Sequence, residues 1–331
     1  MIKTKPEDFI VKEIIELKEG KGRYLYVEVE KTNWNTLDLV NKLSDILNIS
    51  RKNIGFAGYK DKNAVTVQYF SLFNADKNKI KDIRIKDVKI KALFYGDRPI
   101  YIGALKENKF KIIARNLNEK KKLEINFIEN YFDDQRFGNK LNNHLVGEAL
   151  LKRDFKKAVE LIDDNKLNEY ISRKKNDFVG ALKLLDFKMI NFYISAFQSY
   201  LFNCVLKEYL KDYNNFKSKY SIGELLFLKK RIKNFKIPLV NFDFEFRKGK
   251  ISLIYKKLLK DIKLESFIFK EFPYSVSYSV ERDAFADVKD FKYKYEKDEM
   301  NKGKYNSVLE FTLPTGSYDT VVIKKLFPEN L

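Results

Sequence analysis

One carboxylate stands isolated in a loop whose sequence runs Gly55-Phe-Ala-Gly-Tyr-Lys-Asp-Lys-Asn-Ala-Val-Thr-Val-Gln68. The carboxylate belongs to Asp61, and the residues on either side of it are Lys60 and Lys62. Positive charges favour the ionised form of a neighbouring carboxyl group, which is the chemically active form. We therefore expect the chemistry of this chain in this loop.

Other catalytic groups are scarce, because the chain contains one histidine, His144, and one cysteine, Cys204. A single cysteine excludes an intrachain disulfide framework, and one His with one Cys cannot build a zinc or iron site from those ligands. The sequence around His144 lacks a hydrolase signature, so we interpret it as a helix-start or surface residue. No Gly-x-Gly-x-x-Gly or Walker-type loop occurs, so a phosphate-cradling nucleotide fold is not supported.

The charge balance favours a polyanionic partner. Lys and Arg number 65 against 46 Asp and Glu, which leaves a formal net charge of +19. The excess is spread along the chain and interleaved with Tyr and Phe, which indicates a broad face for phosphate contacts and base stacking. A lysine-rich surface that reflects genome bias or a warm habitat is the alternative. We expect nucleic acid as the partner.

Length and hydropathy indicate a soluble protein with two cores. A chain of 331 residues is longer than one core usually fills. No window approaches the roughly 18 uninterrupted apolar residues of a membrane span, and the first residues lack the apolar core of a signal peptide. We expect this protein in the cytoplasm, without a membrane association.

The Asp61 loop should join two strands within a sheet-rich first third of the chain. Alternating apolar residues predict strands over residues 9–14 and 24–30, and the turn residues between them favour a hairpin. A short strand over 54–57 leads into the loop, and a strand over 64–72 leaves it.

Helical patterns dominate the middle of the chain. Asn35, followed three residues later by Asp38, is typical of a helix start in the first third. Apolar spacing predicts further helices over residues 145–162 and 189–213, whereas residues 251–255 have the composition of a strand. The middle therefore indicates a separate, mainly helical unit.

Six motifs in chain order resemble the signatures of the TruD family of tRNA pseudouridine synthases. They span nearly the whole sequence, from the first residues to the last turn. The motifs are Pro6-Glu-Asp-Phe-Ile-Val-x-Glu13, Gly58-Tyr-Lys-Asp-Lys-Asn-Ala-Val-Thr-Val-Gln68, Gly103-Ala-Leu-Lys-x-Asn-x-Phe110, Asn130-Tyr-Phe-x-x-Gln-Arg-Phe-Gly138, Phe197-Gln-Ser-Tyr-Leu-Phe-Asn203 and Leu313-Pro-Thr-Gly-Ser-Tyr-Asp-Thr320.

The resemblance implies cofactor-free isomerisation of uridine to pseudouridine in RNA, at tRNA position 13 in this family. By motif position, Asp61 is the essential carboxylate, either as nucleophile at the ribose C1′ or as the base that removes a ribose proton. The target uridine must be flipped into a pocket. The resemblance implies that Phe132 stacks on the flipped base, that Asn130 fixes the site around Asp61, and that Tyr318 forms a second aromatic wall.

Further residues receive supporting roles from the same resemblance. Lys3 matches the basic partner of the catalytic carboxylate, and Glu7 matches an acidic position of the same N-terminal motif. Gln135 and Arg136 buttress the pocket or contact phosphate. Two other groups belong to the loop motif: Lys60, whose side chain faces either the carboxylate or phosphate, and Gln68, one of only three glutamines in the chain.

The chain departs from the family pattern at two positions. Asp133 replaces the usual glycine, and Asp319 replaces a small residue. Both substitutions add negative charge near the expected RNA-binding pocket, which puts the local contacts in doubt.

The implied fold is an α+β pseudouridine synthase catalytic domain with a mixed, largely antiparallel sheet, plus an inserted family-specific α/β domain. We expect residues 1–142 and 281–331 to form the discontinuous catalytic domain, and 143–280 to form the insertion. We expect tRNA as the partner. We expect no metal, no cofactor and no obligate protein partner.

Two other functional classes remain open at this point. A non-catalytic RNA-binding protein or chaperone would use the same basic, aromatic face and would not need Asp61. A metal-dependent nuclease would combine Asp61 with Asp133 and Asp134, and EDTA would abolish its strand cleavage.

Overall fold

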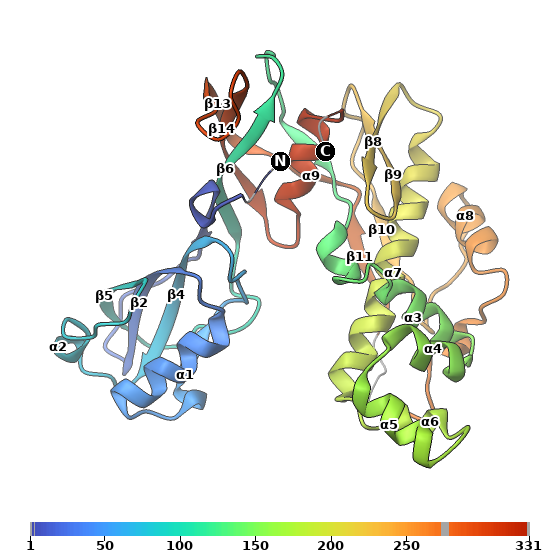
Figure 1. The fold of residues 1–331 in the computed structure, drawn as a ribbon, viewed down its shortest axis with the longest axis horizontal. Helices are drawn as coiled ribbons and strands as arrows, with labels where there is room; N and C mark the ends of the chain where they lie inside the picture. Colours follow the sequence, from blue (N-terminus) through green and yellow to red (C-terminus); the bar gives the residue numbers. More distant parts are fainter. Residues whose placement is uncertain (1, 3, 273–277, 330–331) are drawn as a thin grey trace. The chain divides into compact units, whose positions relative to one another are not determined.

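The chain divides into two compact units, and the computed structural model describes residues 2, 4–272 and 278–329 (Figure 1). The first unit comprises the residues up to Asn126 together with Asp287–Asp319, and the second comprises Phe127–Ala286 and Thr320–Glu329. Residues 127–142, 281–286 and 320–329 thus group with the second unit, although we expected them in the catalytic domain. The assignment of a catalytic domain and an insertion stays a prediction.

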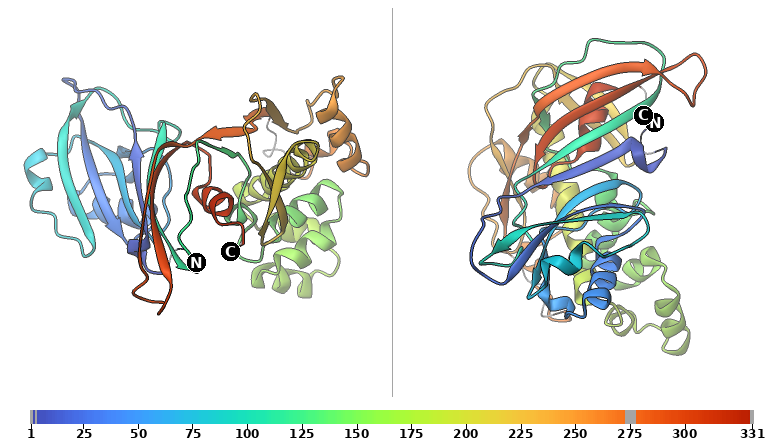
Figure 2. Two further views of the ribbon diagram at one scale, coloured as in Figure 1. Left: turned by 90° about the horizontal axis from the view of Figure 1, so that it is seen from above. Right: turned by 90° about the vertical axis from the view of Figure 1, so that its left-hand side faces the viewer.

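An eight-stranded sheet dominates the first unit, and Figure 2 shows it from two sides. The strand order is β13-β14-β6-β1-β4-β2-β5, with β3 paired to β4. Only β1 and β4 run parallel among these neighbours, so the predicted mixed, largely antiparallel sheet is confirmed. The strands are β1 (Phe9–Ile14), β2 (Tyr24–Thr32), β3 (Ile54–Phe56), β4 (Val65–Phe73), β5 (Val88–Gly96), β6 (Glu107–Leu117), β13 (Lys289–Lys297) and β14 (Tyr305–Pro314).

The predicted hairpin between the first two strands is wrong, although both strands exist. β4 lies between them, parallel to β1 with Ile10 opposite Val65 and antiparallel to β2 with Val29 opposite Gln68. The connection over residues 15–23 is much longer than the short turns that force adjacent strands to pair. Alternation therefore identified each strand but not its neighbour.

Helix α1 (Thr36–Leu47) covers the core side of this sheet and begins where the sequence predicts. The Asn35 side chain accepts a hydrogen bond from the backbone N–H of Asp38 at 2.8 Å, which caps the helix. The helix ends at Asn48, whose φ of 50° is left-handed. Leu39 and Leu43 are buried against the apolar face of the sheet. Short helices α2 (Lys77–Ile80), η1 (Pro6–Asp8) and η2 (Arg51–Asn53) complete the unit.

The second unit combines helices with short two-stranded sheets. Its helices are α3 (Asn143–Leu151), α4 (Phe155–Ile162), α5 (Asn165–Arg173), α6 (Phe178–Leu182), α7 (Phe187–Leu210), α8 (Lys250–Leu258), η3 (Asp134–Phe137), η4 (Leu264–Phe267) and most of α9 (Asp319–Leu326). Its strand pairs are β7 (Phe127–Glu129) with β12 (Phe285–Asp287), β8 (Asn215–Tyr220) with β9 (Gly223–Leu228), and β10 (Lys236–Leu239) with β11 (Val280–Asp283).

The long helix α7 organises this unit and confirms the predicted helix over 189–213. Helix α3 approaches it closely at Gly147, where an added Cβ would lie 2.2 Å from the carbonyl oxygen of Tyr193. The helix predicted over 145–162 is two helices, because the chain turns at Arg153 with a φ of 59°. The strand predicted over 251–255 is wrong, since these residues lie in α8; a short apolar run suits a buried strand and a helix equally.

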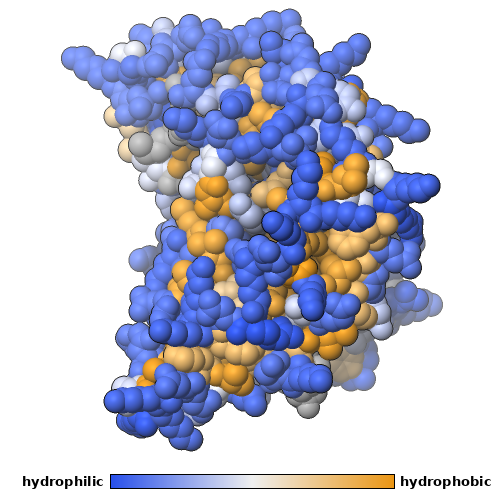
Figure 3. Space-filling view, turned by 90° about the vertical axis from the view of Figure 1, so that its right-hand side faces the viewer, coloured by the Kyte–Doolittle hydropathy of each residue, from blue (hydrophilic) through white to orange (hydrophobic). Residues whose placement is uncertain are grey.

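Apolar side chains are also exposed on the second unit, among them Leu184, Phe187 and Leu253. Figure 3 shows apolar groups lying between polar ones on the side of the molecule that it presents. Within the described part of the chain, none of the helices has the length and apolar character needed to cross a bilayer.

Candidate active site

The Asp61 loop connects the antiparallel neighbours β3 and β4, and Asp61 itself is half-buried. A series of hydrogen bonds between uncharged groups connects the loop to β4 and α1. The Gln68 side chain donates to the carbonyl oxygen of Gly58 at 2.9 Å and accepts from the Thr36 hydroxyl at 3.1 Å. That hydroxyl accepts from the Lys60 N–H at 3.0 Å. Gln68 is fully buried on β4, so the loop backbone is fixed by an amide and a hydroxyl from the core.

The Lys60 ammonium pairs with Glu13 instead of extending into solvent. Its Nζ lies 2.6 Å from Glu13 Oε1, and the Glu13 side chain is completely buried. The other Glu13 oxygen accepts from the backbone N–H of Tyr69 at 3.1 Å. Lys60 therefore ties the loop to β1, which gives it a structural role beside Asp61, while Lys62 is exposed.

A buried lysine that the sequence reasoning missed lies directly behind the loop. Lys31 Nζ donates to the carbonyl oxygens of Trp34 at 2.6 Å and Asp61 at 3.2 Å. The pKa of Lys31 is lowered to about 8, chiefly by burial; the nearby Lys60 also lowers this pKa, whereas Asp61 and Glu13 raise it. The signal was present, because alternation along β2 places Lys31 on the same buried face as Val27 and Val29.

The N-terminal motif is anchored through Asp8, the neighbour of the predicted site residue Glu7. Arg115 binds both oxygens of the buried Asp8 carboxylate, at 2.9 and 2.6 Å, and also Asp298 at 3.1 Å. Glu7 is exposed in η1. Lys3 lies outside the described residues, so its predicted partnership with Asp61 is not addressed by the geometry.

In the second unit, Asn130 and Phe132 follow β7 and share one neighbour, Arg282. Arg282 Nη2 donates to the Asn130 side-chain oxygen at 2.7 Å, and the guanidinium carbon lies 4.2 Å from the centre of the Phe132 ring. Asn203 of α7 clamps the Phe132 backbone, accepting from its N–H at 2.9 Å and donating to its carbonyl oxygen at 2.7 Å. Phe132 is buried and meets Phe202 edge to face.

The two supporting residues predicted in η3 have different surroundings. Arg136 donates to the Ser199 hydroxyl at 3.0 Å and lies 5.6 Å from the Phe132 ring centre, which agrees with a buttress of that ring. Gln135 is exposed.

The unusual Asp133 is neutralised by a lysine from α9. Both carboxylate oxygens accept from Lys324 Nζ at 2.7 Å, and both side chains are almost fully buried. The next lysine, Lys325, pairs with the buried Glu129 at 3.0 Å. The negative charge at residue 133 therefore joins α9 to the β7–η3 segment through a buried ion pair.

The nuclease alternative gains no support from these carboxylates. Asp133 is engaged by Lys324, and Asp134 accepts from the Ser221 hydroxyl at 2.9 Å. Over residues 2, 4–272 and 278–329, no three His, Cys, Asp or Glu side chains gather into a group that could hold a metal ion.

Tyr318 lies between β14 and α9, and it is half-buried. It belongs to the first unit with Asp61, whereas Asn130 and Phe132 belong to the second. Their convergence around one uridine stays a prediction.

Comparison with known proteins identifies the family. The family model described as tRNA pseudouridine synthase D (TruD) matches residues 1–169, 162–236 and 229–326. This chain belongs to the TruD family. The predicted family, enzyme class and α+β fold are confirmed.

Relatives in the TruD family align over nearly the whole chain. The "Probable tRNA pseudouridine synthase D" of Methanosarcina barkeri is 30% identical, over 98% of this chain and 92% of the relative. The tRNA pseudouridine synthase D of Aquifex aeolicus is 29% identical, over 98% and 97%. A crystal structure of the Methanosarcina mazei member superimposes with a TM-score of 0.75 at 27% identity, covering 99% of this chain and 93% of that one.

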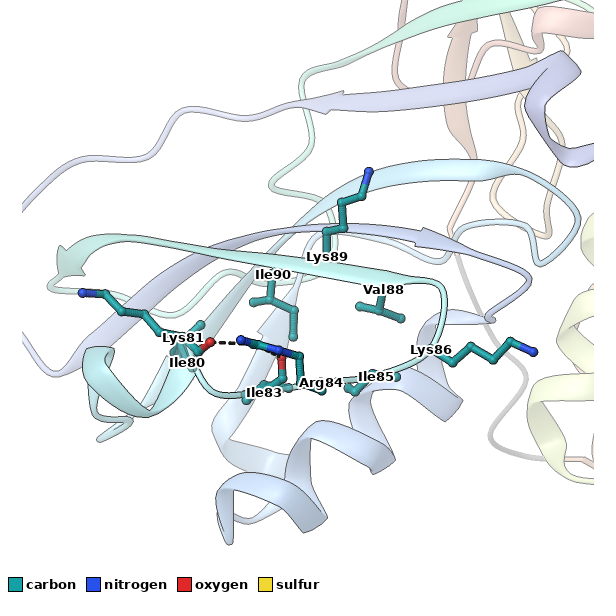
Figure 4. Close-up of a pocket in the computed structure, with 9 residues that line it drawn as sticks. All are labelled: Ile80, Lys81, Ile83, Arg84, Ile85, Lys86, Val88, Lys89 and Ile90. Carbon is teal, nitrogen blue, oxygen red and sulfur yellow. Dashed lines mark hydrogen bonds between the residues drawn. The ribbon is translucent and has the colours of Figure 1, made fainter.

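Two hollows in this TruD-family chain differ in charge. A cavity of about 500 Å³ in the first unit is lined by branched apolar residues and four cations, with no carboxylate (Figure 4). Its cations are Lys81, Arg84, Lys86 and Lys89. A cavity of about 610 Å³ in the second unit has both charges in its lining, including Asp243, Glu245, Arg247 and Lys248.

Proposed function

We propose that this chain converts uridine to pseudouridine at position 13 of tRNA, with Asp61 as the essential carboxylate. The observation that supports this role most directly is the fixed backbone of the Asp61 loop. Buried Gln68 and Thr36 hold the loop from the core, and the Lys31 ammonium donates to the backbone of Asp61 itself. A carboxylate on such a support meets the need of catalysis for groups that are positioned before the reaction.

The reaction rearranges one nucleotide without a net change in composition. The bond between N1 and C1′ breaks, the uracil rotates, and C5 bonds to C1′. C5 then gives up its proton, and N1 gains one. No oxidant, reductant or group donor is consumed, which agrees with a mechanism that uses no cofactor. Asp61 acts either by attacking C1′ or by removing a ribose proton.

The flipped uridine is received, in this proposal, by Phe132 and Tyr318 as aromatic walls. Asn130, Lys3 and Glu7 complete the substrate contacts. Phe132 is suited to this role because Asn203 fixes its backbone and Arg282 covers one face of its ring. Gln135 and Arg136 assist from η3. A preorganised wall lowers the entropic cost of capture, because its own side chain need not be ordered when the flipped base binds.

The surrounding assignments follow from this activity. We propose tRNA as the partner, with no obligate protein partner, and the cytoplasm as the place of action. Its TruD relatives carry names that specify tRNA, and the net charge of +19 suits a polyanionic substrate.

The decisive experiment maps pseudouridine in unmodified tRNA transcripts after incubation with the wild-type chain or with Asp61→Asn. We expect one modified position with the wild type and a loss of roughly 10²–10⁴-fold or more in rate with the variant, since an amide neither attacks nor accepts the proton. The RNA Kd should change less than about threefold, because the substitution removes one charge among several contacts.

Asp45→Asn provides a matched control, since Asp45 is an exposed aspartate on α1 of the same unit. It should retain the wild-type rate. Turnover retained by Asp61→Asn would remove Asp61 from the mechanism. Binding without any pseudouridine, even for the wild type, would favour the non-catalytic RNA-binding class.

A further inference from the structure

Lys31 is a fully buried cation whose end reaches the backbone of the proposed catalytic residue. We propose that Lys31 is a positioning residue for the reaction: its ammonium fixes the Asp61 loop and places a positive charge beside the Asp61 carboxylate. The inference rests on the proposed role of Asp61. It goes beyond that role because it assigns a function to a residue outside the six family-like motifs.

The position of Lys31 within the sheet explains why its charge is directed to the loop. Lys31 lies on β2, the strand next to the edge strand β5, opposite Thr66 of β4 and Val88 of β5. Its side chain is 0% exposed, so the ammonium must find partners inside the protein. Those partners are the carbonyl oxygens of Trp34 and Asp61, at 2.6 and 3.2 Å.

Among the residues that the structure describes, the charged side chains that act on the Lys31 ammonium are Asp61, Glu13 and Lys60. Glu13 already accepts from Lys60 at 2.6 Å and from the Tyr69 backbone. Of the two carboxylates, Asp61 attracts the Lys31 ammonium more strongly than Glu13 does. Lys31 is thus coupled to Asp61 by its hydrogen bond to the Asp61 backbone and by its charge, beside the Lys60–Glu13 ion pair.

The coupling between Lys31 and Asp61 predicts that turnover depends on pH. Burial lowers the pKa of Lys31 to about 8, so the ammonium is charged at neutral pH and becomes neutral as the pH rises through that value. Loss of the proton weakens the hold on Asp61, and turnover should fall above about pH 8.

Stability should change in the opposite direction. The folded-state pKa of Lys31 lies below the unfolded value of roughly 10.4, so the unfolded chain binds more protons between these two values. This group alone therefore makes the fold more stable as the pH rises through that window. A fall in turnover above pH 8 without a fall in melting temperature separates positioning from unfolding.

The test uses single-turnover pseudouridine formation on a tRNA transcript between pH 6 and 9.5, with the full chain. For the wild type we expect an alkaline limb with an apparent pKa near 8. Lys31→Met should be slower by roughly 10–100-fold at pH 7, about the worth of one charge-assisted hydrogen bond, and its profile should lack this limb. Its RNA Kd should stay within about threefold of wild type.

Two further variants sharpen the test. Lys31→Arg keeps a permanent cation, so it should retain more activity than Lys31→Met and should also lack the limb near pH 8. Lys12→Met removes an exposed lysine of β1, paired with Glu28 at 3.0 Å, and should behave as wild type.

A limb near pH 8 that persists in either Lys31 variant would overturn the proposal, as would a wild-type rate in Lys31→Met. If neither variant folds, a wild-type profile without a limb near pH 8 overturns it. These failures differ from a failure of the proposed function, in which the wild type makes no pseudouridine or Asp61→Asn remains active.

Discussion

The Asp61 loop and the β7–η3 segment use the same kind of support but distribute charge differently. A buried amide holds each backbone: Gln68 bonds the loop at Gly58, and Asn203 bonds Phe132 on both sides. Around Phe132, however, the buried carboxylates of Asp133 and Glu129 are each neutralised by a lysine of α9. The loop has one such pair, Lys60 with Glu13, and in addition Lys31, which donates to backbone carbonyls and whose charge acts on Asp61.

This difference separates structural charge from charge that can serve chemistry. In a close ion pair in the protein interior, the attraction between the charges offsets the cost of desolvating both groups. Removing one partner leaves the other charge buried and uncompensated, which destabilises the fold. Carbonyl oxygens do not neutralise a cation that binds them, so its positive charge still acts on a neighbouring carboxylate. In the β7–η3 segment, the Phe132 ring therefore lies beside carboxylates that are neutralised by lysines. In the loop, the Asp61 carboxylate lies near the Lys31 cation.

The largest effect should come from breaking an ion pair of the second segment. Lys324→Met leaves the Asp133 carboxylate buried without its cation, which should cost about 3–5 kcal/mol in the free energy of unfolding. Urea denaturation measures this loss. Adding Asp133→Asn to Lys324→Met should recover much of it, because the uncompensated charge disappears. Equal stability of the single and double variants would show that the pair is not the origin of the loss.

The two buried amides allow the comparison to be sharpened through kinetics. Gln68→Ala leaves the Gly58 carbonyl oxygen without its donor and should cost about 1–3 kcal/mol of stability. We expect it to lower kcat, because the loop that loosens carries Asp61. Asn203→Ala should cost at least as much stability, since two backbone groups lose their partner.

The kinetic effect of Asn203→Ala should instead be mainly a raised KM, because Phe132 is proposed to capture the base. Steady-state kinetics on tRNA transcripts measures both constants. The same kcat and KM changes in both variants would contradict the division of labour between the two regions.

Local patterns in the sequence were sufficient for the elements that carry the site. The Asn35–Asp38 cap and the strands around Asp61 formed as predicted, because each depends on neighbours within a few residues. The order and spacing of the six motifs also identified the family and its fold class.

Long-range partners were not predictable in the same way. β1 and β2 are separated by β4 because sheet order depends on contacts between distant segments. From the sequence, Asp133 had no recognisable partner for its negative charge, because its partner Lys324 is 191 residues away along the chain. Lys31 was overlooked because an isolated lysine is usually solvated, although strand alternation placed it inward.

The smallest expected effect is a difference between the two cavities in how they contribute to the salt dependence of RNA binding. The lining of the first-unit cavity contains no carboxylate, and its exposed Lys81 and Lys86 can face phosphate, whereas Lys89 pairs with Glu30 at 2.9 Å. In the second-unit cavity, carboxylates oppose the cations. Lys81→Ala combined with Lys86→Ala should weaken RNA binding uniformly and reduce its salt slope by about one for each phosphate that is no longer neutralised. The matched variant, Arg247→Ala with Lys248→Ala, should leave the slope unchanged. Equal slopes in both would mean that RNA makes no use of the difference in charge, and that the first-unit cations serve solubility alone.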